Sequence, residues 1–152
     1  FHVLAMIQIL FYVFPIKSDD TWIGWNELAI ETENLQEKYS NTFVFSNDNY
    51  KTSACLNYFM NQKVYAQNII GLPALHFDYL GDDLSNLNGK NAIFIDSDKE
   101  FKDHKMKSDF NPELKYYFQK ITEIQPIIIK KDGKEVRKFW VFYCENYLAK
   151  IN

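Results

Sequence analysis

The first sixteen residues carry no charged side chain, and this uncharged segment constrains the fold more than any other feature. Residues 1–16 include only His2 and Gln8 as strongly polar residues, and charge begins abruptly at Lys17. A membrane-spanning helix needs about 20 mainly apolar residues, whereas sixteen helical residues extend about 24 Å, short of the roughly 30 Å of bilayer hydrocarbon. The segment predicts the end of a membrane-spanning or membrane-associated helix that continues before Phe1.

Residues 1–16 have two other interpretations, a secretory signal and a buried or partner-covered helix. A secretory signal fits poorly, because no basic region precedes the apolar run and no small-residue cleavage pattern precedes Lys17. The remaining alternative is a helix that is buried within a soluble fold or covered by a partner, since apolar runs shorter than a full membrane span are often core segments.

Residues 17–152 have the length of one soluble domain and are long enough to bury a core. The formal net charge of −3 gives no reason to expect a nucleic-acid partner, because such proteins usually carry a basic face. Aromatic residues make up 17% of the chain. This exceeds the needs of an average core and suggests aromatic surface near a membrane or a ligand.

The first half of the domain alternates helical and β patterns. Apolar residues recur at helical spacing over 23–39, and a β-rich run follows at 42–46. Residues 50–61 predict a second helix, and 63–68 a second strand. The expected order is therefore α-β-α-β.

The second half is predicted to complete a mixed sheet. Residues 69–90 are longer than an ordinary connection and read as a functional loop. Residues 91–96 have the continuous apolar character of a buried parallel strand, and the charged stretch 97–109 is expected to be solvated or mobile. Asn111 and Pro112 indicate the start of a short helix that ends near residue 117.

Asp132-Gly133 is the strongest local signal in the second half. It separates two β-rich runs, 127–131 and 135–143, and Asp-Gly in this position favours a two-residue hairpin turn. The sequence thus predicts an α/β, three-layer-like domain. Its sheet is partly parallel, with helices on its faces and a C-terminal antiparallel hairpin, and an apolar helix precedes it.

Ligand-binding candidates come from the expected topology. In open parallel sheets ligands collect at the carboxyl ends of the strands. Five polar residues follow the first two predicted strands or lie in the long loop, and we expect them to converge on one crevice that binds a sugar or a phosphate: Asn47, Tyr50, Asn68, His76 and Asp78. The alternative is that His76 and Asp78 only hold the loop to the domain by hydrogen bonds.

Other chemistry-bearing residues give weaker signals. Asp82 and Asp83 are candidates for a metal or an acid/base pair, although adjacent acids in a turn are more often solvated. Cys55 and Cys144 lack metal-ligand spacing and are expected to be small buried hydrophobes, with a disulfide between them left open. The sequence contains no phosphate-binding glycine-rich loop, nucleophile elbow or His/Cys cluster with ligand spacing. We therefore predict no catalytic residue, metal or cofactor in this chain.

Taken in order, several short segments resemble the soluble C-terminal domain of bacterial membrane glycosyltransferases of the dolichyl-phosphate-mannose protein mannosyltransferase type, relatives of the aminoarabinose transferases. The resemblance covers nearly the whole chain. It lies in an apolar segment ending in Pro, Asp20-Thr21, 24–29, Tyr50 with Ala54, Leu56, Tyr58 and Phe59, Phe77-Asp78, 89–95, and Gly133, Val136, Arg137 and Phe139 up to Cys144 and Tyr147. Leu75-His76 before Phe77-Asp78 departs from many relatives.

The resemblance implies a multi-pass enzyme of the bacterial inner membrane that transfers a sugar from a polyprenyl-phosphate donor to an acceptor. Its catalytic acids would lie in a loop outside the matched region, and this domain would face the periplasm without catalysing the reaction. The expected partners are then the membrane, the transmembrane region of the parent protein and a glycan or lipid-linked sugar. The residues alone leave open two alternatives: a self-contained nucleotide- or sugar-binding α/β protein, and a membrane-tethered binding module.

Overall fold

The computed structural model describes residues 1–11, 13, 23–48, 50–80, 83–103 and 105–149. Three α-helices occur in this part of the chain: α1 (His2–Phe11), α2 (Trp25–Lys38) and α3 (Lys51–Phe59). The strands are β1 (Thr42–Ser46), β2 (Val64–Tyr65), β3 (Asn91–Ser97), β4 (Phe118–Lys131) and β5 (Lys134–Tyr147). Four short 3-10 helices lie between strands: η1 (Gln67–Ile70), η2 (Leu75–Asp78), η3 (Leu84–Leu87) and η4 (Pro112–Tyr116).

The five strands form one mixed sheet in the order β2-β1-β3-β5-β4. β1 pairs in parallel with both β2 and β3, whereas β5 is antiparallel to β3 and to β4. This confirms the partly parallel sheet with a C-terminal antiparallel hairpin. The hairpin is longer than predicted, since each of its strands has 14 residues.

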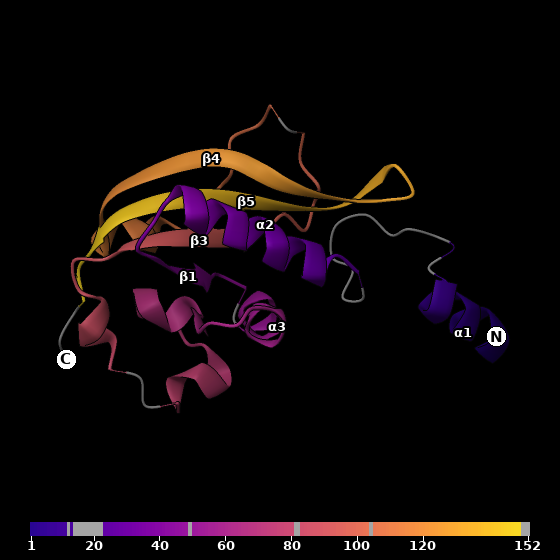
Figure 1. Cartoon of the computed structure of the whole chain (residues 1–152), viewed down its shortest axis with the longest axis horizontal. Helices are drawn as coiled ribbons and strands as arrows, with labels where there is room; N and C mark the ends of the chain where they lie inside the picture. The colour runs from indigo at the N-terminus through magenta and orange to yellow at the C-terminus, as the bar shows by residue number, and fades with distance from the viewer. Residues whose placement is uncertain (12, 14–22, 49, 81–82, 104, 150–152) are drawn as a thin grey trace.

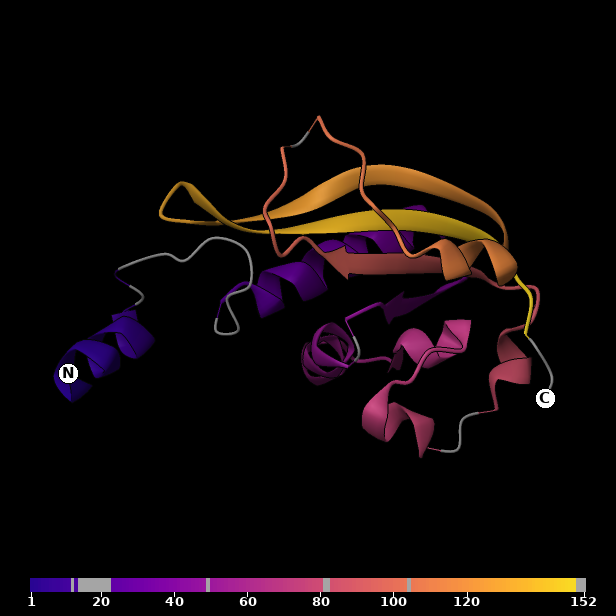
Figure 2. The same cartoon turned by 180° about the vertical axis from the view of Figure 1, so that it is seen from behind.

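Strand alternation divides the core between the two faces of the sheet. Val44, Ile93 and Val141 pack with α2 and α3 on one face. Phe45, Phe94 and Phe142 pack on the opposite face against residues of η1, η3 and η4. Figure 1 shows α2 lying across the sheet, and Figure 2, seen from behind, shows the segment that follows β3 in front of β4 and β5.

This arrangement corrects three expectations. Both α-helices of the domain cover the same face, and 3-10 helices and loops cover the other, so α-helices do not flank the sheet on both sides. The strand predicted at 63–68 is only two residues long, because the chain turns into η1, which Gly71 ends at a φ of +73°. The helix predicted at 111–117 is the 3-10 helix η4, and Asn111 caps it by accepting from the backbone N–H of Glu113 at 3.0 Å.

The apolar helix predicted at 1–16 appears as the ten-residue α1, and none of its residues is buried. Residues 12 and 14–16 of the predicted segment, and the boundary at 17–22, lie outside the described residues. In the part of the chain that the structure describes, no helix combines the length and the apolar character that crossing a bilayer requires.

The two cysteines lie on opposite faces of the sheet. Cys55 packs against the cluster beneath α2 and α3, and Cys144 belongs to the opposite cluster. Both are free thiols, so no disulfide joins them. Burial raises the pKa of the Cys144 thiol, as expected for a small hydrophobe in the core.

Two glycines adopt positive φ for different reasons, and their alanine variants separate these reasons. Gly24 begins α2 at a φ of +87°, and a Cβ there would lie 2.7 Å from Cγ2 of Ile129 on β4. Gly133 follows Asp132, which also has positive φ, in the hairpin turn, and a Cβ there would meet nothing within 4 Å. Gly24 thus permits a close approach between helix and sheet, whereas Gly133 is required only because the turn needs a positive φ.

We predict that Gly133→Ala lowers the free energy of unfolding by about 1–2 kcal/mol, the usual strain of a left-handed non-glycine residue. Gly24→Ala should cost more, on the order of 3 kcal/mol, because overpacking against Ile129 adds to the same strain. Urea denaturation of both variants measures the difference. Equal losses would show that the contact between Gly24 and β4 has no energetic weight.

Candidate functional site

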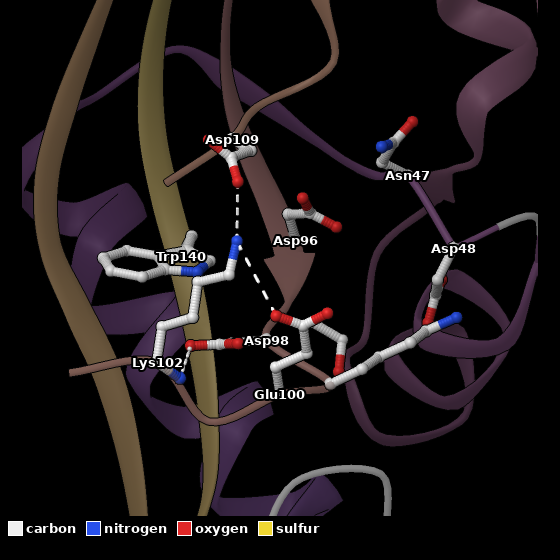
Figure 3. Close-up of a pocket in the computed structure, with 10 residues that line it drawn as sticks. Asn47, Asp48, Asp96, Asp98, Glu100, Lys102, Asp109 and Trp140 are labelled. Atoms are coloured by element: carbon white, nitrogen blue, oxygen red, sulfur yellow. Dashed lines mark hydrogen bonds and ion pairs between the residues drawn. The ribbon is translucent and has the colours of Figure 1, made fainter. Parts of the chain in front are cut away.

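A polar cavity of about 260 Å³ lies where β1 and β3 end. Its position matches the rule that ligands collect at the carboxyl ends of parallel strands. Figure 3 shows the residues around it, which come from the ends of β1 and β3, from the turn after β3 and from β5. The lining residues are Asn47, Asp48, Asp96, Ser97, Asp98, Lys99, Glu100, Lys102, Asp109 and Trp140.

The wall formed by the end of β1 is held by hydrogen bonds. The Asp48 carboxylate accepts from the backbone N–H of Thr52 at 3.0 Å and from its hydroxyl at 2.6 Å, which anchors the first turn of α3. Asn47 accepts from the Asn111 side-chain amide at 3.2 Å. Both residues are therefore fixed in place by neighbouring elements.

A buried ion pair holds the turn after β3. The Lys138 ammonium lies 3.2 Å from the Asp98 carboxylate, and both side chains are almost completely excluded from solvent. Asp98 also accepts from the backbone N–H of Lys102 at 2.8 Å, and Lys138 donates to the Lys102 carbonyl at 2.6 Å. The expectation that 97–109 is a solvated or mobile stretch is thus wrong at its beginning, because Asp98 is buried and paired with β5.

Lys102 lies at the rim of the cavity. Its ammonium donates to Asp109 at 2.6 Å and lies 4.0 Å from Glu100, whose side chain is largely exposed. Figure 3 shows the Lys102 side chain passing between Trp140 and the acidic residues. Such exposed ion pairs contribute little stability, so this rim can rearrange at small cost.

Asp96 and Trp140 are adjacent across the β3–β5 pair. They are directly opposite in the antiparallel register, so their side chains project from the same face of the sheet. Trp140 is only 4% exposed, and Figure 3 shows the nitrogen edge of its indole turned toward the cavity. Within the described residues, neither the Asp96 carboxylate nor the indole N–H bonds to another protein group, and neither is a fully buried polar atom without a partner, so both are open to the cavity.

The surroundings of Asp96 disfavour its charged form. Burial, followed by the nearby Asp48 carboxylate, raises the pKa of Asp96 to about 6, while Lys99 and Lys102 oppose this shift. The cavity lining carries five carboxylates and two lysines, and Lys138 adds one further positive charge beside Asp98. The site is therefore acidic, and it contains one partly desolvated carboxylate beside one unused N–H donor.

The structure does not bring the five predicted ligand residues into one crevice. Asn47 lines the cavity. The other four are not among the residues that line it and lie near α3, η1 and η2: Tyr50, Asn68, His76 and Asp78. The ring centroids of Tyr50 and His76 are 5.8 Å apart, and both side chains are exposed.

Asn68 and Asp78 form hydrogen bonds to backbone groups of the long loop. The Asn68 amide donates to the Phe77 carbonyl at 3.3 Å. The Asp78 carboxylate accepts from the backbone N–H of Ala74 at 2.8 Å. The Asp78 bond joins two residues of the loop itself, and the Asn68 bond joins the loop to η1.

Of the two adjacent acids considered as a metal or acid/base pair, the structure describes only Asp83, which has a structural role. Asp83 accepts from the backbone N–H of Ser85 at 3.0 Å and so caps η3, and these hydrogen bonds lower its pKa. Asp82 lies outside the described residues. No group of three or more His, Cys, Asp or Glu side chains in the described ranges is placed to hold a metal ion.

Sequence reasoning missed Asp96, Asp98, Lys102 and Trp140. Asp96 is the last residue of the strand predicted at 91–96, so the rule that selected Asn47 applies to it equally. No sequence pattern identifies Trp140 as a site residue, because its position beside Asp96 depends on the register between β3 and β5.

A second hollow of about 520 Å³ lies between α2 and the edge strand β4, lined in part by Leu35, Pro126 and Ile128. It contains no buried titratable side chain. The cavity beside Asp96 is therefore the better candidate for a binding site.

Comparisons with protein-family models, with curated proteins and with solved structures found no significant match to this chain.

We predict that Asp96→Asn stabilises the domain at pH 7.5 by about 1–3 kcal/mol, given roughly 1.4 kcal/mol per pKa unit. The folded-state pKa of Asp96, about 6, lies above the ordinary value of 3.8 for this side chain, so the native state binds the proton more tightly. Its destabilising contribution therefore grows as the pH rises from about 4 to 6 and is complete above that range. Urea denaturation at pH 4.5 and 7.5 should show that the advantage of the variant shrinks at the lower pH. A pH-independent advantage would contradict this interpretation.

Proposed function

We propose that this chain is the C-terminal domain of a multi-pass glycosyltransferase that moves a sugar from a polyprenyl-phosphate donor to an acceptor. In this proposal α1 belongs to the membrane, and the α/β domain lies on the periplasmic side of a bacterial inner membrane. The domain itself contributes to acceptor recognition or covers the membrane active site, while catalysis belongs to other parts of the enzyme.

The exposed apolar surface of α1 is the observation that carries this proposal. The exposed fractions of Leu4, Leu10 and Phe11 are 69%, 68% and 70%, and none of the helix residues is buried. Figures 1 and 2 both show α1 beyond the end of the sheet, apart from the α/β domain. A contiguous apolar surface of this kind is typical of an interaction site with a membrane or a partner protein.

The energetics favour a membrane over water around α1. Full burial of one large aliphatic or aromatic side chain is worth about 1.5–3 kcal/mol. Three such residues would together supply several kcal/mol for insertion, without any charged residue to oppose it.

The residues that carry the family resemblance have structural roles in the domain, as the proposal requires. Gly24 allows α2 to approach β4, and Trp25 packs against Arg137, whose guanidinium carbon lies 3.9 Å from the centroid of the Trp25 ring. Gly89 donates its backbone N–H to the Tyr147 carbonyl at 2.8 Å, and the Tyr147 hydroxyl donates to the Ile69 carbonyl at 2.6 Å. These contacts support a domain whose shared residues maintain its fold.

A vesicle-binding experiment tests the role of α1. We expect the full chain to float with phosphatidylethanolamine/phosphatidylglycerol vesicles, and the triple variant Leu4→Ser, Leu10→Ser, Phe11→Ser to stay in solution. The matched control is Ile30→Ser, Tyr58→Ser, Leu80→Ser, which removes three apolar side chains that are also exposed but lie outside α1. Equal flotation of both triple variants would argue against membrane association through α1.

Sugar transfer is tested in the cell of origin. Deletion of the coding segment for residues 23–149 should cause the polyprenyl-phosphate sugar donor to accumulate and leave the acceptor glycan unmodified. Mass spectrometry of extracted lipids and of cell-envelope glycans measures both quantities, and a plasmid copy of the intact gene should restore them. Unchanged lipid and glycan profiles in the deletion strain would overturn the proposed function.

A further inference from the structure

We propose that the cavity between the ends of β1 and β3 is a saccharide-binding site, in which Asp96 and Trp140 hydrogen-bond to hydroxyl groups of one sugar unit. The binding itself is argued from the cavity. The identification of that sugar as part of a donor or acceptor glycan rests on the proposed function.

Two adjacent side chains, Trp140 and Asp96, present hydrogen-bonding groups to the cavity that no other protein group uses. Trp140 is nine-tenths buried, yet its indole N–H faces the cavity and has no acceptor within the described residues. Neither this N–H nor the Asp96 carboxylate is among the fully buried polar atoms without a partner, so both face the open space of the cavity, where a ligand can reach them. The Asp96 carboxylate beside it likewise lacks a donor in the described part of the chain, so a ligand would complete both groups.

These two groups and the charge of the cavity select the chemistry of the ligand. The indole N–H requires an acceptor, and the ionised Asp96 carboxylate requires a donor. A hydroxyl group is both, whereas an ammonium group only donates and a phosphate or carboxylate ligand mainly accepts. The acidic lining also repels anions, because its carboxylates outnumber its lysines. A neutral ligand with several hydroxyl groups therefore fits the site best.

The cavity has the size and the rigidity that binding of one sugar ring requires. A volume of about 260 Å³ is slightly below the roughly 300–1,000 Å³ of sites for drug-sized ligands, which leaves room for one sugar ring. Asp96 and Trp140 lie on paired central strands, and Lys138 lies over the indole ring with its nitrogen 3.5 Å from the centroid. The donor and the acceptor are therefore held in fixed positions, as a binding site requires.

The position of the cavity relates it to the proposed membrane attachment. Figures 1 and 2 both show the beginning of α2 at the end of the sheet where β1 and β3 finish, and α1 precedes α2 in the chain. A sugar carried by a polyprenyl phosphate, or the acceptor that receives it, would approach the domain from this end.

The test uses the indole N–H signal of Trp140 in ¹H–¹⁵N NMR spectra of the full chain, which contains three tryptophans. The probes are the methyl glycosides of glucose, mannose and galactose, with inorganic phosphate and methylamine as comparison ligands. We expect at least one glycoside to shift the Trp140 signal with a Kd of about 1–10 mM, the affinity of a few hydrogen bonds. Phosphate and methylamine should leave it unchanged.

Four variants, one of them a control outside the cavity, assign the binding to the cavity. Trp140→Phe keeps an aromatic ring but removes the N–H donor, and Asp96→Ala removes the acceptor. Each should weaken glycoside binding roughly fivefold or more, followed at backbone amide signals of β3. Asp83→Ala removes a carboxylate that caps η3 and lies outside the cavity, so it should bind like the native chain. Because Trp140 is buried, Asp96→Asn is the second, non-disruptive variant, and it should bind less tightly while remaining folded.

The proposal is overturned if no glycoside shifts the Trp140 signal up to about 50 mM, well above the expected Kd range. It is also overturned if phosphate or methylamine binds more tightly than every glycoside, or if Asp96→Asn binds as the native chain does. These outcomes leave the proposed function standing, because vesicle flotation and donor accumulation do not depend on this cavity.

Discussion

The pairing of β5 with β3 is the constraint on which the rest of the structure depends. It joins the parallel half of the sheet to the hairpin over six consecutive residue pairs, from Ala92 with Cys144 to Ser97 with Phe139. A shift of one residue would exchange the two faces of β5 and move Trp140 into the core beneath α2. The two halves of the hydrophobic core and the cavity beside Asp96 are therefore fixed by the same register.

The same strand carries two buried cations at consecutive positions, and each is stabilised on its own face of the sheet. Arg137 packs against the rings of Trp25 and Phe139 on the face beneath α2. Lys138 pairs with Asp98 and hydrogen-bonds to the turn after β3 on the opposite face. Buried charges are costly without partners, so these contacts tie α2 and the turn to β5. The ion pair of Lys138 thereby shapes one wall of the cavity.

Short sequence patterns correctly predicted the elements that a few neighbouring residues determine. The amphipathic pattern at 23–39, the β-rich run at 42–46 and the Asp132-Gly133 turn all describe what the structure contains, because periodicity and turn chemistry decide them over a few residues. The burial of Asp98 and the position of Trp140 were not predictable in this way. Each depends on a partner more than 35 residues away in the chain, and no local pattern encodes strand register. Asn47 was found because the strand-end rule needs only element order.

The folded domain has two unsatisfied features of opposite chemistry. One is the apolar surface of α1, and the other is the uncompensated carboxylate of Asp96 beside an unused N–H donor. The charged Asp96 carboxylate lowers the stability of the fold, whereas the apolar surface of α1 is exposed in the folded and the unfolded chain alike and gains free energy only on transfer to hydrocarbon. Hydroxyl groups would complete the hydrogen bonds of Asp96 and of the N–H donor. A lipid-linked sugar presents both chemistries in one molecule. The cavity lies at the end of the sheet where α2 begins, and α1 precedes α2 in the chain, so one such molecule, which exposes its sugar close to the membrane that holds its lipid, would meet both features.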